Sequence, residues 1–304
     1  MQKAKSDLKQ NQRIPHLGGV GVFTAFILCA VLAALYSKAF DGPFLGIILG
    51  SLAIVCVGLL DDFIELSPGA KCLGQIIATS VLVFFGVSVK IALLSSGVNI
   101  AITFLWTLSL INALNLLDIM DGLASGITVI AASAFWMVSL LSHNPQALIL
   151  CGIVVGVVLG FLRYNFPPAR IYLGDTGSMF CGFILAAIAM MLDYAPLKRE
   201  VALVTPILVM GLPLFDTAFV VLMRFWQGRP IVKKSRDHFA LRLHAAGWAI
   251  PKVLLFMYSF ALFFAASALL MHKVSNRQGV VILAAITLFC IFALKKIGEI
   301  EINA

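Results

Sequence analysis

Apolar stretches long enough to cross a membrane recur along almost the whole chain, and this recurrence constrains the fold more than any other feature. A helix needs roughly 20 apolar residues to cross the hydrocarbon core of a bilayer. Such a segment must be helical, because hydrocarbon offers the backbone no other hydrogen-bond partner. We predict ten transmembrane helices, at residues 17–36, 43–60, 72–87, 101–117, 122–141, 147–163, 177–192, 201–226, 251–271 and 279–294.

The composition excludes a water-soluble domain. Hydrophobic residues make up 61% of the chain and charged residues only 12%, whereas a soluble domain carries roughly 25% charged residues. We therefore expect one all-α polytopic integral-membrane domain over residues 1–304. The six cysteines form no CxxC pair and mostly lie in apolar stretches, so they predict buried apolar side chains rather than disulfides or a zinc site.

Lysine and arginine are distributed unevenly between the two sides of the predicted bundle. Ten spans place both termini on one side, and that side carries sixteen of the 22 Lys and Arg residues. The positive-inside rule makes this side cytoplasmic. Topology and anionic lipid then explain the net charge of +8, and nucleic acid is not an expected partner.

Acidic residues gather on the same predicted side of the membrane. Six of them lie at or just beyond the predicted cytoplasmic ends of helices: Asp61, Asp62, Glu65, Asp118, Asp121 and Asp175. A topology derived from the basic residues alone has therefore collected the carboxylates on one face. We predict that the active site faces the cytoplasm.

The segment 58–71 (GLLDDFIELSPGAK) ends a predicted helix with two adjacent aspartates. Asp61 and Glu65 are four residues apart and would share a helix face, which crowds two like charges. Such crowding is unfavourable unless a cation or a proton is recruited. An ordinary solvated helix end explains the same pattern equally well.

The segment 112–126 (NALNLLDIMDGLASG) is more informative. Asn112, Asn115 and Asp118 follow one another at intervals of three and could line one helical face, and Asp121 precedes a break at Gly122. Amide and carboxylate oxygens are the hard ligands that Mg²⁺ takes. A capped turn between two spans would explain one aspartate, but not two asparagines and two aspartates together.

The segment 164–182 places Asp175 in a Gly-Asp-Thr-Gly-Ser turn just before a predicted span. Glycine allows a phosphate to approach the backbone, and free N–H groups at a helix N-terminus favour anions. Asp175 would oppose an anion unless a metal bridges the two. An ordinary N-cap is the alternative interpretation.

The segment 228–248 is the largest predicted cytoplasmic loop, and it is basic. A positive-inside loop without further function explains Lys233 and Lys234. His238 lies beside Asp237 and near Arg242, and is a better candidate for contacting a phosphate or a leaving group. The acidic cluster and this loop together suit Mg²⁺ and a nucleotide-activated substrate that is joined to a lipid acceptor.

The order of these motifs resembles the polyprenyl-phosphate N-acetylhexosamine-1-phosphate transferase family, also known as glycosyltransferase family 4. The resemblance runs from the Pro-His-Leu-Gly-Gly segment at residues 15–19 to about Trp248. Four segments carry it, in the order in which the family has them: DDFIELSPGAK, NALNLLDIMDGLASG, PARIYLGDTGS and PLFDT. Each is weak alone, whereas the four together are specific to the family.

The resemblance implies a role for each matching residue. Asn115 and Asp175 would hold Mg²⁺ (or Mn²⁺) on the donor pyrophosphate. Asp61 and Asp62 would handle the lipid phosphate, with Asp62 as the base or the group that positions the acceptor. Lys71 would neutralise phosphate charge.

Further implied roles concern the donor. Asp118 and Asp121 would shape the nucleotide pocket, and His238 and Arg242 would contact the phosphate or the sugar. The implied catalytic residues are Asp61, Asp62, Asp118, Asp121 and His238, and the implied substrate-binding residues are Lys71, Asn112, Arg170 and Arg242.

The implied reaction is attack by an oxygen of undecaprenyl phosphate on the sugar-linked phosphorus of a UDP-HexNAc, with GlcNAc as the expected sugar. UMP would be released, and the product would start a lipid-linked polysaccharide of the cell envelope. The expected partners are UDP-HexNAc, undecaprenyl phosphate and the lipid of the inner (plasma) membrane. A homodimer is an open alternative to a monomer.

Two other classes of protein remain open at this point. A Mg²⁺-dependent membrane prenyltransferase would have Asp-rich repeats on two helices, and the chain has one Asp-Asp pair. An ion-coupled transporter could use Asp216 and the cytoplasmic acids as an ion path. It would have charges in several spans and an inverted repeat, and neither is evident.

Overall fold

A computed structural model of the chain describes residues 15–37, 41–194, 200–228 and 237–300. These residues form helices and turns, and no strand occurs among them. They fall into two compact units, which we call the N-terminal unit (described residues up to 193) and the C-terminal unit (described residues from 194). The expectation of an all-α protein is confirmed for the described chain, and the single domain over 1–304 stays a prediction.

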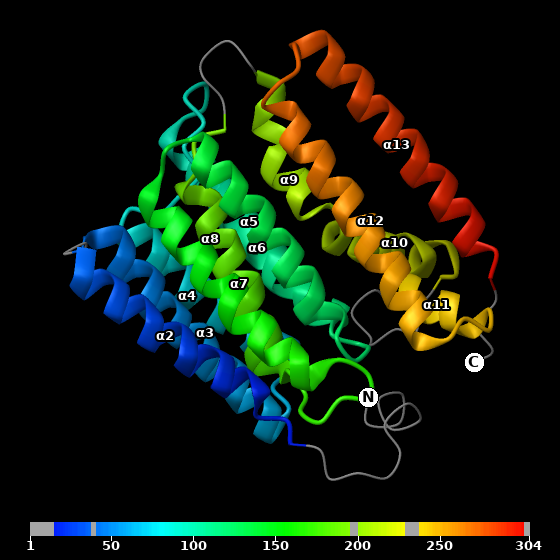
Figure 1. The fold of residues 1–304 in the computed structure, drawn as a ribbon, viewed down its shortest axis with the longest axis horizontal. Coiled ribbons are helices and arrows are strands. Elements are labelled where there is room, and N and C mark those ends of the chain that lie inside the picture. The colour runs from blue at the N-terminus through cyan, green and yellow to red at the C-terminus, as the bar shows by residue number, and fades with distance from the viewer. Residues whose placement is uncertain (1–14, 38–40, 195–199, 229–236, 301–304) are drawn as a thin grey trace. The chain divides into compact units, whose positions relative to one another are not determined.

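The N-terminal unit is a bundle of helices joined by short connections (Figure 1). Its helices are α2 (Gly18–Ser37), α3 (Gly42–Ile64), α4 (Pro68–Phe84), α5 (Ser96–Leu117), α6 (Leu123–Leu141), α7 (Pro145–Asn165) and α8 (Gly174–Met191).

Several of these helices start with the same device. A polar residue occupies the N-cap position and proline follows within the first turn. The side chains of Asp41, Ser67 and Asn144 accept hydrogen bonds from the backbone N–H groups three residues later. The caps satisfy N–H groups that the helix itself leaves unpaired, and proline loses nothing there because its missing N–H would have no partner. This pattern fixes where α3, α4 and α7 begin.

Helix α8 is the centre of the N-terminal unit, because nearly all of its residues are buried and it packs against α2, α3 and α5. Glycines permit this close packing, as is common between membrane helices. Gly19 of α2 faces Gly177 of α8 so closely that a Cβ atom on Gly19 would lie 2.2 Å from the Gly177 nitrogen. Gly58 of α3 and Gly182 of α8 make similar approaches to backbone atoms of Thr176 and Ile111.

The contact between α2 and α8 gives a first prediction. Gly19→Ala would force a methyl group into the backbone of Gly177, and overpacking of this kind costs about 1–3 kcal/mol. The thermal midpoint of the detergent-solubilised protein should therefore fall. Gly21→Ala is the matched control, because a Cβ atom at Gly21 has nothing within 4 Å. Equal midpoints for the two variants would contradict the close approach.

The C-terminal unit contains η1 (Glu200–Val204), α9 (Thr205–Val209), α10 (Gly211–Trp226), α11 (Phe239–Ala245), α12 (Ile250–Met271) and α13 (Asn276–Gly298) (Figure 1). Its core is aromatic: Phe239 of α11 lies against Phe215 and Phe219 of α10 and Phe260 of α12. Phe289 of α13 contacts Phe260 in turn. The short helix α11 is thereby fixed among three longer ones.

The described helices make the protein an integral membrane protein. Eight are long and apolar enough to cross a bilayer, and the count rises to nine if the pair formed by residues 200–209 and 211–226 is one span. The sequence predicted a single span over 201–226, whereas the structure bends there by 72°. The predicted span 72–87 corresponds to α4, which is apolar but has 17 residues. Each of the ten predicted segments overlaps a helix.

Candidate functional site

Polar residues from three of the four motifs meet at one end of the N-terminal unit. The C-terminal ends of α3 and α5, the N-terminal end of α8 and the first turn of α4 lie together there. Charged side chains at this end are supplied by Asp61, Asp62, Lys71 and Asp175. The predicted clustering of these carboxylates is confirmed within this unit.

Asn115 and Asp175 contact each other directly. The amide nitrogen of Asn115 donates to Asp175 Oδ1 and to Ser178 Oγ, each at 3.0 Å. Both N–H groups of the amide thus have acceptors, so the amide oxygen is the atom left to bind a cation. Residues 60 positions apart in the sequence therefore present oxygen atoms from α5 and α8 at one place.

Lys71 bridges two carboxylates at this place. Its ammonium group forms an ion pair with Asp61 and lies 3.5 Å from Asp175 Oδ2. The cap at Ser67 starts α4 so that Lys71 falls in the first turn. A cation near a helix N-terminus is unfavourable by itself, and the two carboxylates offset that cost.

The donor set fits a magnesium ion that is held mainly by its substrate. Mg²⁺ takes hard oxygen ligands and commonly uses one or two carboxylates together with substrate phosphates and water. Asp175 and the Asn115 amide provide such oxygens, and Lys71 shows that the position attracts positive charge. Among the described residues, no group of three or more His, Cys, Asp or Glu side chains could hold a metal by itself.

Asp62 points in a different direction from Asp61. Its carboxylate accepts hydrogen bonds from the backbone N–H groups of Asp175 (2.8 Å) and Thr176 (3.0 Å), and from the Thr176 hydroxyl (2.6 Å). The sequence suggested that free N–H groups at this helix start could receive a phosphate. That expectation is wrong for these two N–H groups, because a carboxylate from α3 already accepts from both.

Glu65 does not share a helix face with Asp61. Helix α3 ends at Ile64, and Glu65 has the left-handed backbone conformation (φ 46°) that turns the chain away. Asp61 instead accepts a hydrogen bond from the Leu66 nitrogen at 2.8 Å. The expected crowding of these two carboxylates is therefore wrong, and Asp175 is the acidic residue that shares Lys71 with Asp61.

Asn112 and Asn115 belong to α5 but contact different neighbours. Asn112 forms a reciprocal amide pair with Gln75 of α4, at 2.8 and 3.3 Å. Asp118 lies just after α5, where its N–H donates to the Asn115 carbonyl at 3.3 Å. The predicted common face for the three residues is therefore wrong, since one asparagine contacts α4, the other contacts α8 and the helix ends before the aspartate.

The turn at Asp121 is joined to the loop that precedes α8. Asp121 accepts from the Ala169 nitrogen at 3.1 Å. Asn165 accepts from Gly122 N and Ser125 Oγ, and donates to the Ile171 carbonyl. Asn165 was not predicted as a functional residue, although it lies in the segment 164–182 that contains Asp175. Its buried amide holds the two loops together.

Tyr172 completes this region of the N-terminal unit. Burial raises the pKa of its phenol, and the neighbouring Asp121 carboxylate adds to the shift. The phenol therefore stays neutral at physiological pH. Its ring contacts His16, and its backbone pairs with Pro15 and Gly18. Residues 15–19, where the family resemblance begins, therefore pack against the loop that leads into α8. Arg170 is an exposed residue of the same loop.

His238 and Arg242 lie in the C-terminal unit. Asp216 of α10 accepts hydrogen bonds from His238 Nδ1 at 2.7 Å and from the Phe239 nitrogen at 2.8 Å. Arg242 pairs with Asp237 at 2.9 Å and donates to the carbonyls of Gly298 (3.0 Å) and Ile300 (2.5 Å). Arg242 is buried, and these partners fix the start of α11 to the end of α13.

A second prediction follows from the buried guanidinium. Breaking one partner of a buried ion pair costs about 3–5 kcal/mol, so Arg242→Gln should lower the thermal midpoint markedly. Lys252→Gln is the control, because Lys252 is exposed and its charge contacts only the face of Trp248 among the interactions described for it. An unchanged midpoint for Arg242→Gln, with weakened donor binding, would instead assign the side chain to the substrate.

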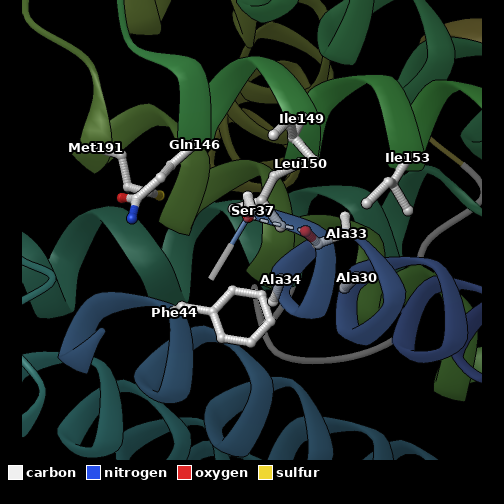
Figure 2. Close-up of a pocket in the computed structure, with 10 residues that line it drawn as sticks. All are labelled: Ala30, Ala33, Ala34, Ser37, Phe44, Gln146, Ile149, Leu150, Ile153 and Met191. Atoms are coloured by element: carbon white, nitrogen blue, oxygen red, sulfur yellow. Dashed lines mark hydrogen bonds between the residues drawn. The ribbon is translucent and has the colours of Figure 1, made fainter. Parts of the chain in front are cut away.

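An apolar pocket lies at the opposite end of the N-terminal unit (Figure 2). It is formed where α2 and α8 end and where α3 and α7 begin, and Ser37, Phe44, Gln146 and Met191 line it together with alanine and aliphatic side chains. Helices α3 and α8 carry Asp62 and Asp175 at their other ends. The pocket therefore lies a full helix length away from these two carboxylates.

The chain is similar to proteins of one known family. Residues 44–193 match the family model for glycosyl transferase family 4. The chain is 30% identical, over 88% of its length, to a probable undecaprenyl-phosphate N-acetylglucosaminyl 1-phosphate transferase of Bacillus subtilis, covering 76% of that relative. The chain belongs to glycosyl transferase family 4. It is accordingly a transferase, and the family recognised from the four motifs is confirmed.

Other relatives extend the range of substrates within the family. A decaprenyl-phosphate N-acetylglucosaminephosphotransferase of Mycobacterium leprae is 31% identical, with coverage of 90% of this chain and 77% of the relative. A phospho-N-acetylmuramoyl-pentapeptide-transferase of Streptococcus uberis is 32% identical, with coverage of 85% and 86%. The identities are similar, so they favour neither sugar over the other.

Proposed function

We propose that the protein transfers GlcNAc-1-phosphate from UDP-GlcNAc to undecaprenyl phosphate and releases UMP. Membership in the family supports the transfer of a hexosamine-1-phosphate to a polyprenyl phosphate, as the relatives are named for it. The observation that carries the proposal is the contact between Asn115 and Asp175 with Lys71 beside them. This arrangement suits a diphosphate that is bridged by a divalent cation.

We propose Mg²⁺ as the cofactor, bound by Asn115 and Asp175, with Mn²⁺ able to replace it. When bound, the ion stabilises the charge that develops on the donor phosphates during transfer. Lys71 would neutralise further phosphate charge, and Asp61 would hold Lys71 in place. An oxygen of undecaprenyl phosphate attacks the sugar-linked phosphorus, the bond between the two donor phosphates breaks, and UMP leaves with the electron pair.

The remaining roles are proposals of the same kind. Asp118 and Asp121 would shape the nucleotide site, and the exposed Arg170 would contact the donor from the adjoining loop. His238 would be a donor-binding or proton-transferring group, with Asp216 setting the orientation of its ring. Asn112 would act indirectly through its pair with Gln75.

The proposed topology has ten spans, with both termini and the acidic cluster on the cytoplasmic side of the plasma membrane. The Lys and Arg distribution supports this orientation, and UDP-sugars and UMP would then be handled in the cytoplasm. A reporter that is active in the cytoplasm should work when fused after Ala304, and one that is active outside should work near Asn144. The opposite pattern would contradict the proposed orientation.

The sugar is tested by donor profiling. The purified protein is incubated with undecaprenyl phosphate, Mg²⁺ and several UDP-HexNAc donors, including UDP-MurNAc-pentapeptide. The lipid products are then identified by mass spectrometry. GlcNAc-diphosphoryl undecaprenol is the expected product. A product formed from UDP-MurNAc-pentapeptide alone would replace the proposed donor while keeping the class of reaction.

A further inference from the structure

The Asp62 side chain binds to the start of α8, although Asp62 belongs to α3. Its two carboxylate oxygens accept three hydrogen bonds, two from backbone N–H groups in the first turn of α8 and one from the Thr176 hydroxyl. A helix leaves these N–H groups without partners of its own, and its dipole favours a negative charge beside them. Asp62 therefore caps α8 from another helix.

The packing around these contacts is close. Gly58 lies one turn before Asp62 on the same face of α3, and a Cβ atom there would lie 2.6 Å from Thr176 Cα. Gly174 has φ +72°, and a Cβ atom there would approach both Asp62 oxygens, at 2.9 and 3.1 Å. Only residues without a side chain allow α3 and the start of α8 to come so near.

The hydrogen bond to the Asp175 backbone connects Asp62 with the proposed metal site. Fixing the Asp175 N–H fixes the direction in which its side chain leaves the helix. That side chain is the one that accepts from Asn115 and lies near Lys71. Asp62 thus reaches the metal site through the backbone of α8, while its own oxygens are already bound by three donors.

We infer that Asp62 is a positioning residue, which holds the first turn of α8 so that Asp175 presents its carboxylate to the donor-bound cation. This inference rests on the proposed function, and it replaces the role at the lipid phosphate that the family resemblance implied for Asp62. A phosphate approaching Asp62 would have to displace the N–H donors and would meet a like charge.

Thr176 provides the test, because it touches Asp62 and is fully buried. Thr176→Val removes the hydroxyl donor with little change in shape, and Thr176→Ser keeps the donor. Asp62→Asn removes one of the two acceptor oxygens and the charge. All variants are measured for Mn²⁺ binding in the presence of UDP-GlcNAc by electron paramagnetic resonance, for KM with undecaprenyl phosphate, and for hydrogen exchange of the peptide that begins α8.

The expected results separate positioning from contact with the acceptor. Loss of an outer partner of a metal ligand typically costs about 10- to 100-fold in metal affinity or activity. Asp62→Asn should weaken Mn²⁺ binding by that factor, Thr176→Val should do so by a smaller factor, and Thr176→Ser should behave like the unmodified protein. KM for undecaprenyl phosphate should not change. A double variant that combines Asp62→Asn with Thr176→Val should bind Mn²⁺ no more weakly than Asp62→Asn, because the two substitutions act on the same hydrogen bond.

Other outcomes would overturn the inference. A raised KM for undecaprenyl phosphate in Asp62→Asn, with Mn²⁺ binding unchanged, would show that Asp62 binds the lipid phosphate of the acceptor. Unchanged hydrogen exchange at the start of α8 in both Asp62→Asn and Thr176→Val would show that Asp62 does not hold the first turn of α8. This measurement depends neither on metal binding nor on turnover. Failure of the proposed function shows differently, as an absence of UMP release from the unmodified protein while exchange at α8 still responds to Asp62→Asn.

Discussion

Replacing Asp175 by asparagine should reduce turnover by several orders of magnitude while leaving the protein folded. The Asp175 carboxylate is proposed to bind the donor-bound cation, and charge stabilisation of this kind is worth several kcal/mol in the transition state. Each 1.36 kcal/mol corresponds to about a tenfold change in rate. Asparagine keeps the shape and can still pair with Asn115, so the loss concerns charge rather than packing.

The matched control is Asp193→Asn. Asp193 follows the other end of the same helix, α8, and is exposed. UMP release is measured across a range of Mg²⁺ concentrations, together with the thermal midpoint of each variant. Asp193→Asn should resemble the unmodified protein. Near-normal turnover of Asp175→Asn at limiting Mg²⁺ would remove Asp175 from the site.

The second large effect is expected for Lys71→Met. Without the ammonium group, Asp61 and Asp175 lose the cation that they share, and like charges held close together disfavour one another. The variant also loses the positive charge proposed to neutralise phosphate. Removing one preorganised electrostatic group from an active site typically lowers kcat by about 10²- to 10³-fold.

Lys90→Met is the control for this variant, since Lys90 is exposed in the connection between α4 and α5. Donor binding by calorimetry is measured beside UMP release. If UDP-GlcNAc binding is weakened in Lys71→Met and unchanged in Lys90→Met, Lys71 contacts the donor phosphate as proposed. If Lys71→Met kept full turnover and full donor binding, Lys71 would be a structural counter-ion of Asp61 and no more.

The sequence predicted the helical class and the main elements of the site because both follow from local patterns. Apolar length identified each span, and the positions of Asp61, Asp62 and Asp175 at helix ends predicted that they would gather at one end of a bundle. Asn115 and Asp175 were paired by family resemblance, and the structure places them in contact. The spans and the gathering of the aspartates need only helix lengths and the alternation of helix directions, whereas the pairing of Asn115 with Asp175 needed the family motifs.

Other features of the site and the fold depend on contacts between segments that are distant in the sequence, and the pattern of one segment does not predict such contacts. The left-handed residue at Glu65 ends α3 and separates it from Asp61. The directions of Asp62 and Asn112 depend on the neighbours that α8 and Gln75 of α4 provide. Asn165 had no visible motif, because its function is to join two loops that are distant in sequence. The bend after α9 likewise divides a stretch whose hydropathy is continuous.

An isotope in the donor tests most directly whether the protein transfers the sugar together with its phosphate. UDP-GlcNAc labelled with ³²P at the sugar-linked phosphorus is incubated with the protein, undecaprenyl phosphate and Mg²⁺, and the lipid and aqueous phases are separated. We expect the label in the lipid product and unlabelled UMP in the water phase. Label that stays in the water phase as UDP, beside a glycosylated lipid, would show transfer of the sugar alone and contradict the proposed reaction.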